Sequence, residues 1–215
     1  MHVNGDASLW GDLFPDHLVP DILKLVVDTW QTFSKPKSTD HEVPISRRFC
    51  EDLRREKDSR RLPFRISPES SETDPISGKE IGRIDIRFTH GYRERVYFAF
   101  ECKRLRINRT APNTHAYVGT DGMMCFIDGK YAGNLDSGGM IGYVMDGDIP
   151  RAIAAVSKAI ANKSKDLCLV TGTGMMPSGM VPDVSVTETH HKISARHFII
   201  YHLFLAISSC SGYPI

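Results

Sequence analysis

Two short apolar strand patterns that carry charged residues are the feature that most limits what this chain can fold into. The first pattern covers residues 82–88 and contains Asp85, and the second covers residues 96–103 and ends in Glu101 and Lys103. Side chains two positions apart on a strand share a face, so Glu101 and Lys103 should project side by side. Asp85 joins them if the two strands pair. We therefore expect a sheet with a cluster of charges at one point.

Such a cluster is hard to explain as packing. Charged groups avoid apolar strands unless they are paired or bind a cation. Two carboxylates and an ammonium that meet at one point are a natural site for a divalent metal with a water activated beside it. The alternative is a surface hairpin with a cross-strand ion pair, and Asp85 alone would fit that alternative better. The combination of Asp85, Glu101 and Lys103 favours the site.

Composition and length predict one soluble globular domain with a substantial core, because the 215 residues are 41% hydrophobic and 25% charged. The five cysteines form no CxxC pair, which argues for a reducing compartment and against a disulfide framework or a structural zinc site. No signal peptide is predicted at the N-terminus. The longest apolar stretch, residues 198–207, is shorter than the ~20 residues of a spanning helix. We expect a cytoplasmic protein without a membrane partner.

The spacing of apolar residues predicts an α/β fold with a central mixed β-sheet flanked by α-helices. Helices are expected over residues 20–33, 42–57 and 115–126, and from Pro150 onward. Two glycines weaken the pattern over residues 115–126. Besides the two charged strands, short strands are expected at residues 63–67, 139–145, 184–192 and 197–207, with the last two paired antiparallel.

The domain organisation predicted from these patterns is a single domain over residues 1–215. It consists of an N-terminal helical decoration at residues 1–37, a core at residues 38–207 and a tail at residues 208–215. Residues 67–78 are rich in Ser, Pro and Glu and predict a loop or the tip of a long hairpin. Residues 172–182 are rich enough in glycine to predict a flexible loop.

Basic residues are concentrated around the two charged strands. Between residues 47 and 109 there are 17 Lys and Arg against 11 Asp and Glu, a net charge of +6, which leaves −5 for the rest of the chain. An excess of this kind suits a phosphate-binding surface. For residues 47–61, where acids are interleaved, a solvated helix face rich in ion pairs is an equally good interpretation.

The segments Gly82-Arg83-Ile84-Asp85 and Phe100-Glu101-Cys102-Lys103 together resemble the signature of the PD-(D/E)xK superfamily of restriction-endonuclease-like nucleases. In that family an Asp ends one strand of a central mixed sheet, and a Glu-x-Lys ends the next strand. Its members usually carry a further Glu on a helix before these strands, to which Glu42 or, less well, Glu51 corresponds. The chain has Arg83-Ile84 where a Pro often precedes the Asp. The resemblance covers residues 42–202, and four residues make up its specific content.

The resemblance implies a metal-dependent endonuclease that hydrolyses the phosphodiester bonds of DNA, with RNA left open as a substrate. Asp85 and Glu101 would hold Mg²⁺, for which Mn²⁺ can substitute, because this ion prefers hard oxygen ligands. By analogy with the family, the backbone carbonyl of Cys102 is a third ligand. Glu42 would bind a metal-bound water or a second metal ion.

Lys103 and the arginines after it are expected to have different roles. Lys103 would orient or deprotonate the attacking water, or stabilise the charged phosphate. Arg104, Arg106 and Arg109 come directly after it and could grip the nucleic-acid backbone, although they could equally solubilise a loop.

Two other functions stay open. The chain could be a catalytically silent protein of the nuclease fold that binds nucleic acid or a partner protein in a larger complex. It could also be a hydrolase of small phosphorylated substrates. A small nuclease domain without a specificity module suggests a homodimer or a component of a larger complex, and antiviral defence against foreign DNA is a reasonable role.

The remaining motifs are weaker. Residues 169–174 imitate a strand that leads into a dinucleotide-binding loop, but the third glycine and the helix that should follow are missing. The four histidines of the last two strands have no Cys or acidic partner at ligand spacing, which favours core or surface histidines over a zinc site. The side chain of Cys102 should point away from Glu101 and Lys103, so a small buried residue is its simplest role.

Overall fold

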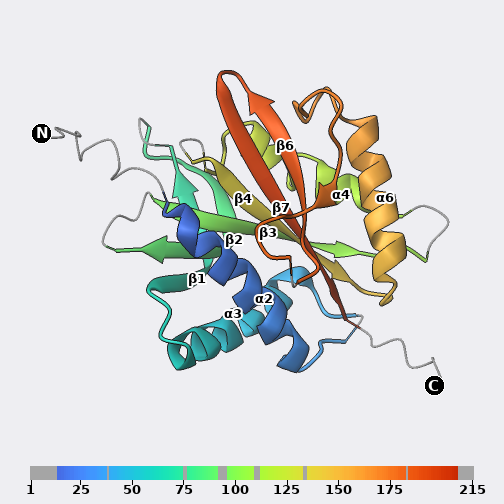
Figure 1. The fold of residues 1–215 in the computed structure, drawn as a ribbon. Helices are drawn as coiled ribbons and strands as arrows, with labels where there is room; N and C mark the ends of the chain where they lie inside the picture. Colours follow the sequence, from blue (N-terminus) through green and yellow to red (C-terminus); the bar gives the residue numbers. More distant parts are fainter. Residues whose placement is uncertain are drawn as a thin grey trace, which may run out of the picture.

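Seven strands form one mixed sheet in the part of the chain that the computed structural model describes, residues 14–37, 39–74, 77–91, 96–108, 112–132, 135–182 and 184–207. The strand order is β1-β2-β3-β4-β7-β6-β5, and helices lie on both faces of the sheet (Figure 1). The predicted α/β class with a central mixed sheet is therefore confirmed. The predicted tail at residues 208–215 and residues 1–13 of the predicted decoration lie outside the described residues.

The sheet has antiparallel strands towards both edges and parallel strands at its centre. Its strands are β1 (Phe64–Thr73), β2 (Glu80–His90), β3 (Tyr97–Leu105), β4 (Ser137–Val144), β5 (Met176–Pro177), β6 (Thr187–Ile193) and β7 (Arg196–Ala206). β1, β2 and β3 form an antiparallel meander, and β4 runs parallel to both β3 and β7. The antiparallel pairing predicted for the last two long strands is confirmed in β6 and β7.

Helices cover both faces of this sheet. They are η1 (Asp16–Leu18), α2 (Val19–Thr32), α3 (Glu42–Ser59), α4 (Thr114–Val118), α5 (Met124–Ile127) and α6 (Ile149–Asn162). α2 and α3 pack on one face and share a core with it, and α4, α5 and α6 pack on the other (Figure 1). α2, expected within a decoration, contributes buried residues to the same core as α3. None of the described helices is long and apolar enough to cross a membrane.

One expected helix was wrong in extent, and one alternative left open by the sequence is decided by the structure. The single helix expected over residues 115–126 is two short helices, α4 and α5, with a turn between them. The backbone is so tight there that a Cβ on Gly122 would lie 2.1 Å from the carbonyl oxygen of Tyr117. Residues 67–78 were expected to form a loop or the tip of a long hairpin, and the hairpin is the correct alternative, because β1 keeps its pairing with β2 as far as Thr73.

The two charged strands stop pairing at the charged residues. β2 and β3 are paired from Thr89 and Tyr97 to Ile86 and Phe100. Beyond this point β2 stays with β1, and β3 stays with β4 up to its last residue. Asp85 and Glu101 occupy the next positions of the two strands and lie where the strands separate.

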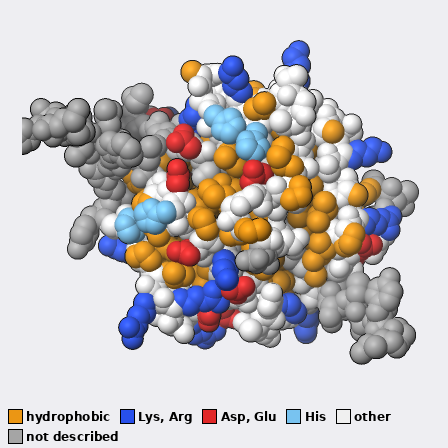
Figure 2. Space-filling model, in the orientation of Figure 1, with side chains coloured by type: hydrophobic (Ala, Val, Ile, Leu, Met, Phe, Trp, Pro, Cys, Tyr) orange, Lys and Arg blue, Asp and Glu red, His pale blue; other side chains and the backbone are white. Residues whose placement is uncertain are grey.

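The charged face of α3 is used largely in ion pairs. Arg54 bonds to Glu51 at 2.6 Å and Arg60 to Glu56 at 2.8 Å, both within the helix. Lys, Arg, Asp and Glu side chains are interleaved over the lower part of the face in Figure 2, where α3 lies. For residues 47–61 the structure therefore favours the interpretation as a solvated helix face.

A chain of buried hydrogen bonds runs from Tyr117 of α4 through β7 and β6 to Leu167, which follows α6. Tyr117 Oη lies 2.9 Å from His202 Nδ1, and Thr189 Oγ1 lies 2.9 Å from His202 Nε2 and 2.7 Å from His191 Nε2. His191 Nδ1 is 2.7 Å from the carbonyl oxygen of Leu167. Because that oxygen can only accept, the whole chain donates in one direction, from Tyr117 towards Leu167, with both histidines neutral. These two are core histidines, as predicted.

The buried histidines make the fold sensitive to acid. Burial lowers the pKa of His191 to about 4 and that of His202 to about 3. Their unfolded pKa is about 6.5, so the unfolded chain binds more protons below that pH, and the stability they contribute is lost as the pH falls from about 6.5 towards 4. We expect the two histidines together to lower the free energy of unfolding by about 3 to 5 kcal/mol between about pH 7 and pH 4.5, whereas carboxyl groups with a raised pKa act in the opposite direction; comparison of urea unfolding between the wild type and histidine variants isolates the histidine contribution.

Two variants isolate this effect. His202→Phe keeps a ring in the core but removes one titrating group, so its free energy of unfolding should fall less steeply with acid than that of the wild type. His115 is exposed on α4, and His115→Gln should keep the wild-type profile. Parallel profiles for the wild type and His202→Phe would contradict the assignment.

Candidate functional site

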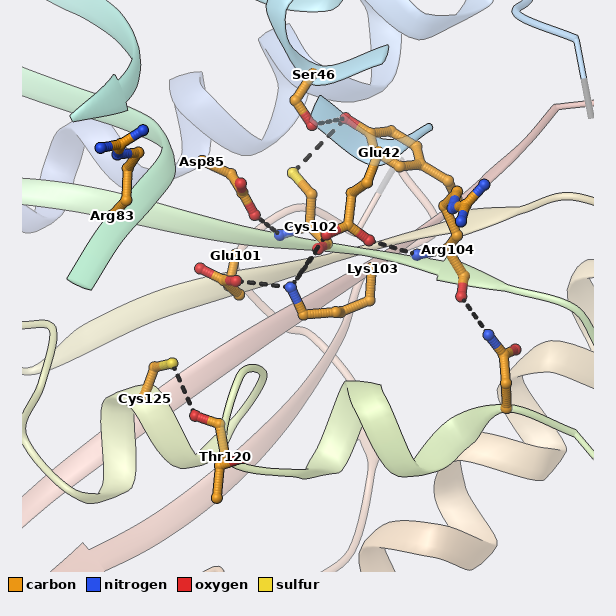
Figure 3. A network of polar contacts seen from close by, with 12 residues as sticks. Glu42, Ser46, Arg83, Asp85, Glu101, Cys102, Lys103, Arg104, Thr120 and Cys125 are labelled. Carbon is orange, nitrogen blue, oxygen red and sulfur yellow. Dashed lines mark hydrogen bonds and ion pairs between the residues drawn. The ribbon is translucent and has the colours of Figure 1, made fainter. Parts of the chain in front are cut away.

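Asp85, Glu101 and Lys103 come together where β2 and β3 separate (Figure 3). Lys103 Nζ lies 2.7 Å from Glu101 Oε1, and Asp85 Oδ2 accepts a hydrogen bond of 2.7 Å from the backbone N–H of Cys102. The three charged residues are 9%, 5% and 8% exposed, in sequence order. Charged side chains are rarely buried this far without a paired or functional role.

The geometry follows from the strand pattern. Glu101 and Lys103 lie on the face of β3 that packs towards α4 and α5, whereas Cys102 points to the opposite face and belongs to the core under α2 and α3. There Tyr143 Oη lies 3.6 Å from Cys102 Sγ and 3.1 Å from Ser46 Oγ. The small buried role predicted for the Cys102 side chain is confirmed, and its thiol is turned away from the charges.

Glu42 is the helical acid that reaches the site. It is the first residue of α3, and its Oε1 lies 3.2 Å from Lys103 Nζ. Its Oε2 accepts a hydrogen bond of 2.9 Å from the backbone N–H of Arg104. Glu51, the alternative, is exposed and pairs with Arg54. The structure thus brings Glu42 into the cluster and leaves Glu51 outside it.

Burial and crowding make both strand carboxyl groups difficult to ionise. Burial raises the pKa of Asp85 to about 6, although the Lys103 ammonium and the Cys102 N–H act in the opposite direction. Burial and then the neighbouring Asp85 raise the pKa of Glu101 well above its usual range. In addition, Glu101 Oε2 is buried without a hydrogen-bond partner. The two carboxyl groups therefore have less positive charge around them than their ionised forms require.

Lys103 stays protonated in this environment. Burial alone would lower its pKa, but the carboxylates of Glu101, Glu42 and Asp85 together raise it above the usual value. Lys103 Nζ also donates to the carbonyl oxygen of Cys102 at 2.8 Å. At neutral pH the group is a donor and a positive charge, not a base.

The donor set of the cluster fits a hard divalent cation. Among the described residues, no three His, Cys, Asp or Glu side chains are grouped as a metal site, and Lys103 Nζ contacts both Glu42 and Glu101. The available ligand atoms are nevertheless all oxygens, and one of them is the unpartnered Oε2 of Glu101. Oxygen donors with excess negative charge are what Mg²⁺ and Mn²⁺ prefer.

Of the arginines after Lys103, Arg104 has a side chain that is held by the protein itself. Arg104 donates through its guanidinium to the carbonyl oxygen of Asp40, 2.8 Å away, which fixes the chain just before α3. Arg106 is half-buried, and its backbone N–H donates to Asn113 Oδ1 at 2.7 Å. Arg109 lies outside the described residues.

The sequence reasoning did not identify the wall that faces the charges. Cys125 of α5 and Thr120 lie opposite Glu101 and Lys103 (Figure 3). Tyr131 and Lys130 follow α5 and contact β2 near Gly82. Gly82 could have indicated this contact from the sequence, because a glycine inside a strand pattern indicates the close approach of another segment.

The fold and the site define an α/β protein with a nearly buried cluster of carboxylates and one ammonium at the centre of a mixed sheet. Comparison of the chain with known protein families, with characterised proteins and with solved structures finds no match. The function therefore has to be argued from the site alone.

Proposed function

We propose that this protein is a Mg²⁺-dependent endonuclease of the PD-(D/E)xK kind that hydrolyses DNA. The observation that carries the proposal is the convergence of Asp85, Glu101, Lys103 and Glu42 at one point. These are an Asp on one strand, a Glu-x-Lys on the neighbouring strand and a Glu on the preceding helix, which is the arrangement that the resemblance implies. A surface hairpin with an ion pair would leave these groups exposed, whereas the three strand residues are nearly buried.

The residue types suit phosphodiester hydrolysis, which needs an activated water and stabilisation of charge on the phosphate and the leaving oxygen. Asp85 and Glu101 would hold the metal, with the backbone carbonyl of Cys102 beside them. When bound, Mg²⁺ lowers the pKa of a coordinated water and neutralises developing charge on the phosphate. Mn²⁺ should replace it, because it has similar ligand preferences.

Lys103 contributes as a donor. Its raised pKa favours the roles of orienting the attacking water and stabilising the charged phosphate over the role of removing a proton. Glu42 bonds to Lys103 Nζ and to the backbone of Arg104, so it fixes the ammonium relative to the strand. Ammonium and carboxylates are thus positioned before a substrate arrives, which limits reorganisation during reaction.

A catalytically silent protein of the same fold is the second candidate. The observation that favours it is the bond of Lys103 to both Glu42 and Glu101, which neutralises part of the cluster without a metal. Such a protein would bind nucleic acid or a partner in a larger complex. The two candidates differ in one measurable property, the hydrolysis of DNA.

Plasmid cleavage separates these functions. We expect supercoiled DNA to be nicked or linearised with Mg²⁺ or Mn²⁺ and to remain intact with EDTA, because the carboxylates need the cation to act. Binding of DNA without cleavage under all metal conditions would favour the silent protein. Hydrolysis of nucleotides but not of DNA or RNA would favour a hydrolase of small phosphorylated substrates.

A further inference from the structure

Lys130 is a half-buried cation near the cluster. Its Nζ lies 5.5 Å from the centre of the Tyr131 ring, a cation–π contact that holds the ammonium in place. In the described part of the chain, no Asp or Glu lies within ion-pair distance of Lys130. The stem of the side chain is thus partly covered, and no described carboxylate neutralises its positive charge.

Gly82 makes room for this lysine on β2. A Cβ at Gly82 would lie 2.4 Å from Lys130 Cε and 2.8 Å from Tyr131 Cε1, so only glycine lets the two side chains lie across the strand. Gly82 precedes Asp85 on the same strand and lies beyond the point where β2 leaves β3. The aliphatic part of Lys130 therefore lies against β2 at Gly82, three residues before Asp85.

The segment that carries Lys130 is fixed on both sides. Tyr131 Oη donates to the carbonyl oxygen of Arg83 at 2.7 Å and accepts from the backbone N–H of Arg83 at 3.1 Å. Arg196 donates to the carbonyl oxygen of Ala132 at 2.7 Å. Burial and then the Glu101 carboxylate raise the pKa of Tyr131, which is consistent with a position close to the cluster. Burial and then Glu101 raise the pKa of the Cys125 thiol, whereas Lys130 acts to lower it, so the ammonium and the Glu101 carboxylate act on the same side chain of α5.

We propose that Lys130 binds a phosphate of the DNA backbone next to the bond that is cleaved at Asp85, Glu101 and Lys103. This inference rests on the proposed function. A nearly buried pair of carboxylates repels a polyanion, and an unpaired lysine beside them supplies an opposing charge. A compact ammonium suits a phosphate oxygen as a point charge. A contact of this kind positions the duplex without reading its sequence.

The test compares two lysine variants of equal charge. Lys130→Met keeps an unbranched apolar stem over Gly82 and Tyr131 but removes the ammonium, and Lys24→Met removes an exposed ammonium from α2. Binding of a fluorescent DNA duplex in EDTA is measured by anisotropy over a range of KCl concentrations. We expect Lys130→Met to weaken binding about 5- to 10-fold for all sequences and to reduce the slope of log K against log[KCl] by about 1. Lys24→Met should change neither quantity.

A further variant moves the lysine without changing the charge. Gly82→Ala places a methyl group against the Lys130 stem and should also weaken binding, whereas Lys130→Arg should keep the wild-type slope. Equal affinity and slope for the two methionine variants would overturn the role of Lys130 even if the wild type cleaves DNA. A wild type that neither binds nor cleaves DNA would instead overturn the proposed function. Thermal unfolding of each variant identifies loss of fold, and if Lys130→Met does not fold, Gly82→Ala decides.

Discussion

Replacing Lys103 with methionine should reduce Mg²⁺-dependent plasmid cleavage by at least about 10²- to 10³-fold, the range for loss of a preorganised donor. Methionine retains most of the stem but cannot donate to the water or the phosphate. The initial rate of loss of supercoiled DNA on an agarose gel measures the effect. Full activity in Lys103→Met would contradict the central role of this residue.

The cleavage assay has to allow for a lower stability of the Lys103→Met protein. Lys103 is the counter-ion of Glu101 and Glu42, and removal of one partner from a buried ion pair costs about 3–5 kcal/mol. Cleavage is therefore assayed below the thermal midpoint of each protein. Lys158 is exposed on α6, and Lys158→Met should retain activity. Lys103→Arg keeps the charge but presents a planar fork, so it should fold and still lose most of the cleavage.

Glu101→Gln is expected to abolish both cleavage and the stabilisation of the protein by metal. A ligand at about 100 times its Kd stabilises a folded protein by about 2.7 kcal/mol, which corresponds to a rise of about 5–10 °C in the thermal midpoint for a chain of this size. The wild type should show such a rise with Mn²⁺. Glu101→Gln should show almost none, because a neutral amide is a much poorer ligand than a carboxylate. Differential scanning fluorimetry with and without Mn²⁺ measures the change without reference to activity.

The matched control is Glu51→Gln on α3. Glu51 is exposed and pairs with Arg54 outside the cluster, so this variant should keep the full stabilisation by Mn²⁺. Equal metal-induced shifts in Glu101→Gln and the wild type would show that Glu101 is not a ligand. Thermal unfolding without metal gives the baseline of each variant, because Glu101→Gln also removes one partner of the Glu101–Lys103 ion pair.

Local patterns predicted the parts of the site that depend on one strand. The alternation of side chains along β3 placed Glu101 and Lys103 on one face and Cys102 on the other, and both placements hold. Asp85 required a pairing register that spacing alone does not supply, because a shift of one residue would turn it away. The meander of β1, β2 and β3 provides that register.

The remaining parts depend on tertiary packing. Glu42 and Glu51 lie on the same helix, and only the docking of α3 against the sheet decides that its first residue reaches Lys103. The break between α4 and α5 depends on backbone contacts around Gly122 that outweigh the helical spacing of the apolar residues. Lys130 reaches β2 because the segment after α5 folds back onto Gly82.

The hydrogen bond from the Cys102 N–H to Asp85 gives Asp85 a structural role in addition to its proposed role as a metal ligand. It spans the opening between two strands that no longer pair, so it acts as a brace at the fork of the sheet. Loss of the Asp85 carboxylate would remove this link between β2 and β3, and we expect Glu101 and Lys103 to be displaced together. A variant of Asp85 would therefore lose activity for two reasons at once, a missing metal ligand and a displaced site. Variants of Glu101 and Lys103 test the chemistry more directly, because they leave the hydrogen bond between Asp85 and Cys102 in place.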